Sequence, residues 1–176
     1  MLDKILEFLL NLIEQILPCY VIHAYEEAVF YRFGKVYSTK GPGLHWKIPF
    51  LDSYSKDTVT TDTMRIQDVN ITTLDGKTAT IGGEFDLVIS DITKAINDTH
   101  DWRSNLQDIS RGVLSDSLED INWEDIRKKT TKNSIEKKIA KRALDMGITT
   151  TNFSFTDKVL SRSIKLFGVE EKIKSN

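Results

Sequence analysis

The sequence of 176 residues is 40% hydrophobic and 9% aromatic, which is enough for the packed core of one domain with a short appendage. Its formal net charge of −2 gives no global attraction to anionic lipid or to nucleic acid, and we expect no nucleic-acid partner. The single cysteine excludes an internal disulfide, and the three scattered histidines lack metal-ligand spacing, so we expect no metal and no other cofactor.

Residues 2–17 predict an amphipathic helix, because their polar positions fall on one narrow arc of a helical wheel. Pro18 ends this helix, since proline cannot continue the hydrogen-bond ladder. Ten apolar side chains fill the rest of the helix surface and are the predicted contact with a membrane or a partner protein: Leu2, Ile5, Leu6, Phe8, Leu9, Leu10, Leu12, Ile13, Ile16 and Leu17.

A membrane-spanning role for this helix is disfavoured, because it would reach about 24 Å and the hydrocarbon core of a bilayer is roughly 30 Å thick. The segment also lacks the basic start and the small-residue cleavage site of a signal peptide. Two alternatives remain, a helix lying in the membrane interface and a helix packed on protein. In the first case Cys19 is a candidate for S-acylation, and otherwise it is a small buried residue.

The next segment favours β-strands. Residues 20–25 and 28–33 are rich in β-branched and aromatic side chains, and a turn is expected at residues 34–35. Residues 41–43 then form a tight loop, and residues 44–49 alternate as a half-buried strand.

Three motifs follow one another in this segment: EAVFYRFGKV at residues 27–36, GPGLH at residues 41–45 and IPFLD at residues 48–52. Together they resemble the opening of an SPFH domain (Band 7), the domain of stomatins, prohibitins and flotillins. Their order and spacing are more specific than any one motif alone. The resemblance implies an α+β fold, in which an antiparallel β-rich part is followed by an α/β part; here the amphipathic helix precedes both.

The resemblance continues through a hairpin formed by strands at residues 64–73 and 77–90. Asp75 and Gly76 between them are a strong signal for a hairpin turn. Residues 82–83, two glycines, interrupt the return strand and predict a bulge or the close approach of another backbone.

The second half predicts helices followed by a closing strand. A short helix capped by Asp91 or Thr93 comes first, and a longer one covers residues 103–119. A third is expected to begin at the cap residue Asn122, with Asp125 as a weak capping-box partner, and to end at Gly147.

Residues 148–157 alternate like the strand that closes the SPFH core, so the resemblance covers about residues 20–157. The domains are therefore a helix at residues 1–18, an SPFH/Band 7-like domain at 19–157 and a short helix with a tail at 158–176. The long coiled coil of the family is not expected in this last segment.

Charge is unevenly distributed along the chain. Residues 52–101 hold ten acids and four bases, a net charge of −6, whereas residues 124–142 hold eight bases and three acids, a net charge of +5. This asymmetry suits head-to-tail association of copies, and ordinary solvated faces are the alternative. The bases form the candidate oligomer contact: Arg127, Lys128, Lys129, Lys132, Lys137, Lys138, Lys141 and Arg142.

The sequence contains no nucleophile motif, phosphate-binding loop or ligand cluster, so we expect neither an enzyme nor a small-molecule substrate. The leading hypothesis is a peripheral or monotopic scaffold on the cytoplasmic side of a membrane, forming homo-oligomers that organise lipids or membrane proteins. The resemblance implies membrane proteases or channels as partners. The alternative is a structural subunit of a virus particle or another large assembly, with the N-terminal helix packed between subunits.

Overall fold

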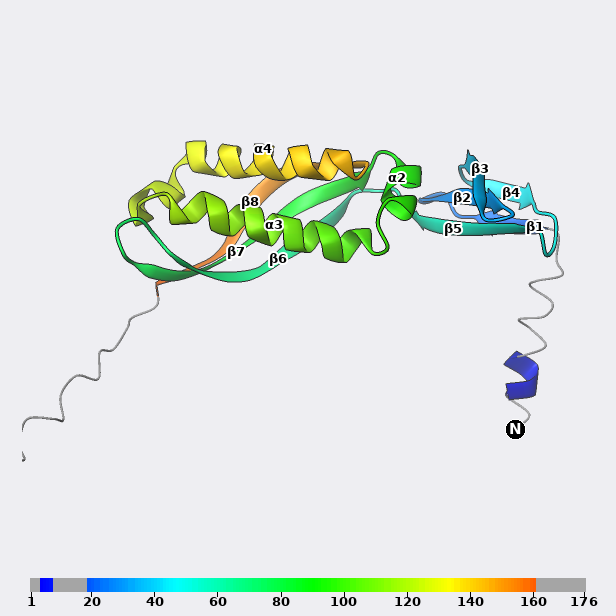
Figure 1. Cartoon of the computed structure of the whole chain (residues 1–176), viewed down its shortest axis with the longest axis horizontal. Coiled ribbons are helices and arrows are strands. Elements are labelled where there is room, and N and C mark those ends of the chain that lie inside the picture. Colours follow the sequence, from blue (N-terminus) through cyan, green and yellow to red (C-terminus); the bar gives the residue numbers. More distant parts are fainter. Residues whose placement is uncertain (1–3, 8–18, 161–176) are drawn as a thin grey trace, which may run out of the picture.

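The computed structural model describes residues 4–7 and 19–160 and confirms the α+β architecture, with a β-rich half and an α/β half placed end to end (Figure 1). The β-rich half consists of β1 (Cys19–Ile22), β2 (Glu26–Arg32), β3 (Lys35–Lys40), β4 (Gly43–Trp46) and β5 (Asp52–Thr58). The α/β half consists of β6 (Asp62–Thr72), β7 (Thr78–Ile89), α3 (Trp102–Glu119), the 3-10 helix η1 (Trp123–Arg127), α4 (Lys129–Asp145) and β8 (Ile148–Leu160). The short helix α2 (Ile92–Asn97) lies between the halves.

Two small antiparallel sheets form the β-rich half, the ribbon β1-β4 and the sheet β3-β2-β5. Strand β2 alternates between two cores, as successive side chains on a strand must. Phe30 stacks on Tyr20 of β1, with ring centroids 4.7 Å apart, while the adjacent Val29 faces the opposite way into the core of the α/β half.

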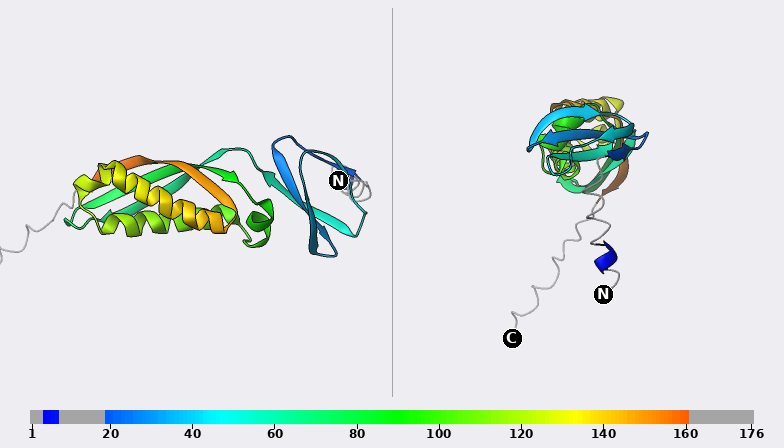
Figure 2. Two further views of the ribbon diagram at one scale, coloured as in Figure 1. Left: turned by 90° about the horizontal axis from the view of Figure 1, so that it is seen from above. Right: turned by 90° about the vertical axis from the view of Figure 1, so that its right-hand side faces the viewer.

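The α/β half is one antiparallel sheet, β6-β7-β8, covered on one face by α3 and α4 (Figure 2). The helices bury apolar stripes at helical spacing, which is why they pack there. The buried stripe residues are Leu106, Leu114 and Leu118 on α3 and Ile135, Ile139 and Ala143 on α4. The other sheet face carries hydrogen-bonded polar pairs, among them Thr63–Asp86 and Asn70–Thr80.

The predicted hairpin turn and the predicted irregularity at the two glycines are confirmed. Gly76 has a φ of 74° and closes the β6–β7 turn. Gly82 stands opposite two residues on β6 and two on β8, so the bulges lie on the flanking strands. A Cβ at Gly82 would collide with the Asp68 carboxylate and lie 2.8 Å from the Thr156 hydroxyl, so these two side chains would have to move.

The single helix predicted from Asn122 is wrong. Lys128 has an extended backbone, with ψ at 141°, and separates η1 from α4. The Asn122 side chain caps nothing; the first η1 amide, that of Trp123, instead donates to the Asp75 carboxylate at 3.1 Å. That partner lies 48 residues away in the hairpin turn, beyond the reach of any local capping pattern.

Two strand boundaries also differ from the prediction. The strand expected to reach residue 49 ends at Trp46 in β4. The sequence predicts a C-terminal helix from residue 158, and this start is wrong. Residues 158–160 extend β8 instead, because this long strand continues its pairing with β7 as far as Leu160 opposite Ala79. Residues 161–167 of that predicted helix lie outside the described residues.

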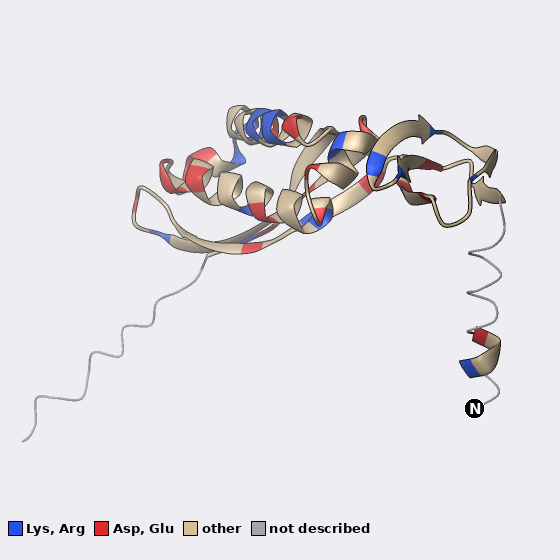
Figure 3. Ribbon diagram, turned by 45° about the vertical axis from the view of Figure 1, so that its right-hand side comes forward, with Lys and Arg blue, Asp and Glu red and all other residues tan. Residues whose placement is uncertain are grey.

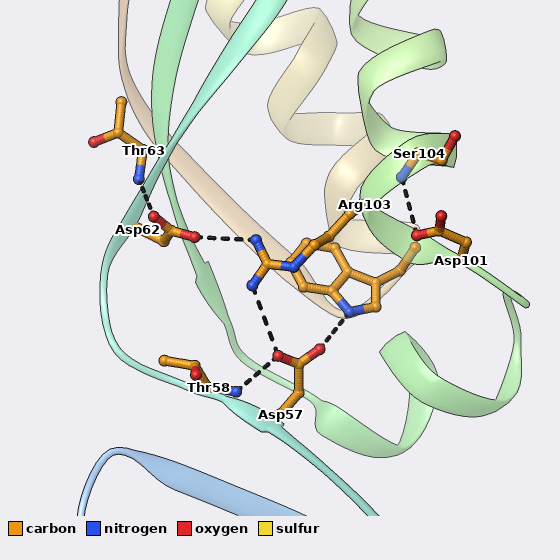
Figure 4. Close-up of polar contacts among 8 residues, drawn as sticks. Asp57, Thr58, Asp62, Thr63, Asp101, Arg103 and Ser104 are labelled. Atoms are coloured by element: carbon orange, nitrogen blue, oxygen red, sulfur yellow. Dashed lines mark hydrogen bonds and ion pairs between the residues drawn. The ribbon is translucent and has the colours of Figure 1, made fainter.

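A polar cluster ties the two halves together where β5 leads into β6 (Figure 4). Arg103, in the first turn of α3, lies between two carboxylates, 3.0 Å from that of Asp62 and 3.7 Å from that of Asp57. The indole N–H of Trp102 donates to Asp57 at 2.7 Å, and the Tyr31 hydroxyl donates to Asn97 at 2.6 Å. These contacts link β2 and β5 of one half to α2 and α3.

Candidate functional site

The free end of the β-rich half brings together two loops that are distant in sequence. The β2–β3 turn contains Phe33, and the β4–β5 loop spans residues 47–51. They meet because Arg32 pairs with Asp52 across β2 and β5, and the Phe33 amide donates to the Leu51 carbonyl at 3.2 Å. We name the exposed large apolar residues at this end the apolar tip: Phe33, Trp46, Ile48, Phe50 and Leu51.

Two phenylalanines of the apolar tip have unusual backbones. Phe33 and Phe50 have φ values of 51° and 67°, in the left-handed region that bulky residues rarely adopt. Their side chains are 75% and 86% exposed, so burial of the rings within the chain does not offset this strain. Strained, outward-pointing aromatic residues cluster at binding surfaces.

An ion pair beneath the loops holds them in place. Arg32 donates to both carboxylate oxygens of Asp52, at 2.8 and 3.0 Å, and the Ile48 amide donates to the same carboxylate at 2.9 Å. These donors lower the pKa of Asp52 to about 2. The Asp52 side chain is 1% exposed, so the one acid near the tip is neutralised internally.

The ribbon β1-β4 extends the apolar surface. Its inner face packs Tyr20 and Ile22 on Phe30. On its outer face Val21 lies opposite Leu44, and Cys19 lies opposite Trp46. Trp46 and Leu44 are 69% and 62% exposed, so this two-stranded ribbon is apolar on both faces. An outer face of this kind lacks the polar residues typical of a solvated sheet.

The tip is also cationic. Residues 32–53 hold four bases and one acid, a net charge of +3. Lys35 is exposed and Lys47 is half-buried beside the aromatic residues, and a hollow of about 360 Å³ lies between the two loops. Exposed aromatic side chains with lysines around them are typical of surfaces that enter the headgroup region of an anionic bilayer.

The apolar tip is missing from the sequence-based predictions. Phe33 ends a strand-like run and Phe50 belongs to a family motif, so nothing local indicated that both rings point outward. Two signals were nevertheless present: each phenylalanine borders a glycine or proline turn, and no acid except Asp52 occurs in residues 32–53.

The predicted N-terminal contact lies mostly outside the described residues. Residues 4–7 form a helical turn, in which Ile5 and Leu6 are exposed. The other eight residues of that contact are not described. Cys19 is a free, half-buried thiol at the first position of β1, where the N-terminal segment joins the β-rich half.

The predicted basic contact lies far from the tip, in the α/β half. Arg127 belongs to η1, Lys128 follows it, and the other six bases lie on α4. Lys128 pairs with Asp125 at 2.6 Å. Burial and the nearby Arg127 and Lys132 lower the pKa of Lys158, so cations crowd together where β8 passes η1 and α4.

Most acids of the stretch 52–101 have structural roles. Eight of its ten carboxylates accept hydrogen bonds within the chain: Asp52, Asp57, Asp62, Asp75, Glu84, Asp86, Asp91 and Asp101. Asp91 and Asp101 cap α2 and α3. This stretch therefore offers few uncommitted carboxylates to a basic partner.

In the described part of the chain, no group of three or more His, Cys, Asp or Glu side chains could hold a metal ion. Nor does any helix among the described residues have the length and apolar character needed to cross a bilayer.

Comparison with known proteins adds one finding to this geometry. The model of the SPFH domain / Band 7 family matches residues 20–165, which include both halves of the described structure. The sequence matches no curated protein.

Proposed function

Because the chain belongs to the SPFH/Band 7 family, whose members are generally membrane-associated, non-enzymatic scaffolds, we propose that it attaches to a membrane surface by its apolar tip and there organises lipids or membrane proteins. The observation that carries this proposal is the exposure of Phe33 and Phe50 on strained backbones beside lysines.

The energetics of the tip suit reversible attachment. Full burial of the three aromatic side chains Phe33, Trp46 and Phe50 would contribute roughly 5–9 kcal/mol before the cost of immobilisation is subtracted. Lys35 and Lys47 would each add about 1 kcal/mol near an anionic leaflet. The loops are held in place by Asp52, so little further ordering is needed on binding.

The amphipathic segment at residues 2–17 supplies the second attachment in this proposal. It directly precedes β1, which begins at the same end of the molecule as the apolar tip. Two weak membrane signals together give stable anchoring where one gives only marginal binding. Cys19 lies between them, so S-acylation there would reinforce peripheral attachment on the cytoplasmic side. Membrane proteases or channels are the proposed partners.

Flotation with vesicles tests the role of the tip. We expect the variant Phe33→Asn with Phe50→Asn to bind anionic vesicles at least about tenfold more weakly than wild type, because two inserted rings are lost. Asparagine tolerates the left-handed backbone, so the loops keep their shape. The matched control is Leu74→Asn, which removes a 70% exposed apolar side chain from the β6–β7 turn in the other half.

Equal flotation of wild type and the tip variant would contradict the proposal. So would an equal loss in the Leu74→Asn control, since that residue lies away from the tip. Wild-type binding should also weaken on neutral vesicles, because the tip carries a net charge of +3.

The alternative function, a structural subunit of a virus particle or another large assembly, uses the same exposed tip. In that case a neighbouring chain would cover Phe33 and Phe50, with the N-terminal helix packed between subunits. Discrete oligomers would then form without lipid or detergent, and the tip variant would dissociate them. Dissociation of these oligomers by the tip variant, measured by light scattering of the purified chain, distinguishes this alternative from membrane attachment.

A further inference from the structure

Two surface patches of opposite charge occur in the α/β half. The first, which we name the α3–η1 corner, consists of Asp116, Glu119, Asp120 and Glu124, all exposed. The second, which we name the α4 row, consists of Lys137, Lys138, Lys141 and Arg142, also exposed. Figure 3 shows acidic residues at one end of the helical layer and basic residues along α4.

The charge of each patch is concentrated in a short piece of chain. Residues 116–125 contain five acids and no base, a net charge of −5. Residues 129–145 contain six bases and two acids, a net charge of +4. The α3–η1 corner itself holds four acids and the α4 row four bases. The two patches are therefore equal in magnitude and opposite in sign, which is the condition for mutual attraction.

Neither patch is neutralised within the described chain. No carboxylate of the α3–η1 corner forms an ion pair with a described base, although Glu119 accepts a hydrogen bond from Ser115 at 2.9 Å. In the α4 row, Lys138 donates to the Ser117 hydroxyl at 2.9 Å, and no member pairs with a described acid.

The α4 row is unfavourable for the isolated helix. Lys137 and Lys141 are four positions apart, as are Lys138 and Arg142, and like charges at this spacing destabilise a helix. Apart from the Lys138–Ser117 hydrogen bond, these side chains form no hydrogen bond or ion pair within the described chain, and the buried stripe of α4 lies on its other face. Their charge is therefore available to a partner outside the chain.

We propose that the α4 row of one copy binds the α3–η1 corner of another copy. The acidic partner is thus the corner and not the stretch 52–101, most of whose carboxylates already accept hydrogen bonds within the chain. The exposed Leu144, one helical turn after Lys141, adds apolar area beside the row. At a membrane this contact would supply the oligomers of the scaffold, and in that respect it rests on the proposed function.

Charge reversal in the full-length chain tests this contact. The row variant carries Lys137→Glu with Lys141→Glu, and the corner variant carries Asp116→Lys with Glu119→Lys. In sedimentation velocity at about 0.01 M salt, where the Debye length is about 30 Å, we expect each variant to self-associate at least about tenfold more weakly than wild type. Wild-type association should disappear at about 1 M salt, where the Debye length is about 3 Å.

Complementation makes the test specific. An equimolar mixture of the two variants should associate again, because the normal row of one variant meets the normal corner of the other and the reversed patches also attract. A chain with all four substitutions should self-associate as wild type does. The control variant, Lys94→Glu with Arg111→Glu, makes the same change in net charge as the row variant at two exposed positions elsewhere and should associate normally.

Failure of the mixture to associate would overturn the proposal, as would a wild-type monomer at low salt or equal association of all variants. The row variant should still float with vesicles as wild type does. The contact between copies and the attachment to membranes can therefore fail separately.

Discussion

At the scale of single residues, the Arg32–Asp52 pair determines the shape of the apolar tip. Asp52 is almost fully buried, yet it remains ionised because Arg32 and the Ile48 amide donate to it. A buried carboxylate with such partners fixes the loop geometry, since breaking the pair would leave an uncompensated charge. The left-handed backbones of Phe33 and Phe50 on either side are maintained by this anchor.

The pKa of Asp52 predicts acid sensitivity of the tip. Because this pKa falls from 3.8 to about 2 on folding, the stabilisation is fully present above about pH 4 and is lost as the pH falls through 2. The protection of the Ile48 amide against hydrogen exchange, relative to an unfolded chain at the same pH, should therefore fall between pH 4 and pH 2. In Asp52→Asn this fall in protection should be absent, and the protection should already be lower than that of wild type at pH 7. Unchanged protection at Ile48 down to pH 2 would exclude the anchoring role.

At the scale of elements, Gly147 joins the α4–β8 turn to the start of α2. Its carbonyl accepts hydrogen bonds from the amides of Ser90 and Asp91, both at 2.9 Å. Its φ is 75°, as the helix C′ position requires, and a Cβ there would lie 2.5 Å from the Asp91 carbonyl oxygen. Glycine is therefore required at position 147 for two reasons: the end of α4 needs a left-handed residue there, and Asp91 at the start of α2 leaves no space for a Cβ.

Two glycine-to-alanine changes should have opposite effects. Gly147→Ala should lower the free energy of unfolding by roughly 2–5 kcal/mol, because the cost of a left-handed backbone at alanine adds to the cost of the clash with the Asp91 carbonyl. Gly112→Ala, on an exposed part of α3 with nothing within 4 Å of the new Cβ, should raise it by up to about 1 kcal/mol. Urea denaturation measures both, and a neutral Gly147→Ala would refute the packing described here.

At the scale of the whole molecule, the junction sets how the tip is presented relative to the α/β half. Besides the chain itself, the Arg103 cluster (Figure 4), the Tyr31–Asn97 hydrogen bond and the packing of Val29 into the core of the α/β half cross it. These contacts join the two halves, so they restrain the angle between the apolar tip and the charged helices.

Loss of the Arg103 cluster should loosen this angle without unfolding the chain. Arg103→Ala should lower stability by no more than about 1 kcal/mol, because its ion pairs are partly exposed. It should, however, broaden the distance distribution between spin labels placed on the two halves, measured by double electron–electron resonance. Arg111→Ala, which removes an exposed arginine from the same helix, should leave the distribution unchanged. Equal distributions in all three proteins would show that the cluster does not restrain the junction.

Local patterns in the sequence determined much of the α/β half. Helical spacing predicted the extent of α3 to within one residue, alternation predicted most of β8, and Asp75-Gly76 and Gly147 predicted two chain reversals. Each of these signals depends on residues within a few positions of one another, so no tertiary information is needed to detect it. The motifs at residues 27–52 determined the family for a similar reason, because they record short stretches of local structure.

Only the tertiary structure decided which surfaces are exposed and which charges are free. Phe33 and Phe50 have the composition of core residues, and they face outward because the Arg32–Asp52 pair joins loops 17 residues apart. Most acids of residues 52–101 are engaged within the chain, several of them by distant strands and helices, whereas no carboxylate of the α3–η1 corner forms an ion pair with a described base. Local periodicity predicts which side chains share a face of a helix or strand. Contacts between segments remote in the sequence decide whether that face is buried or exposed.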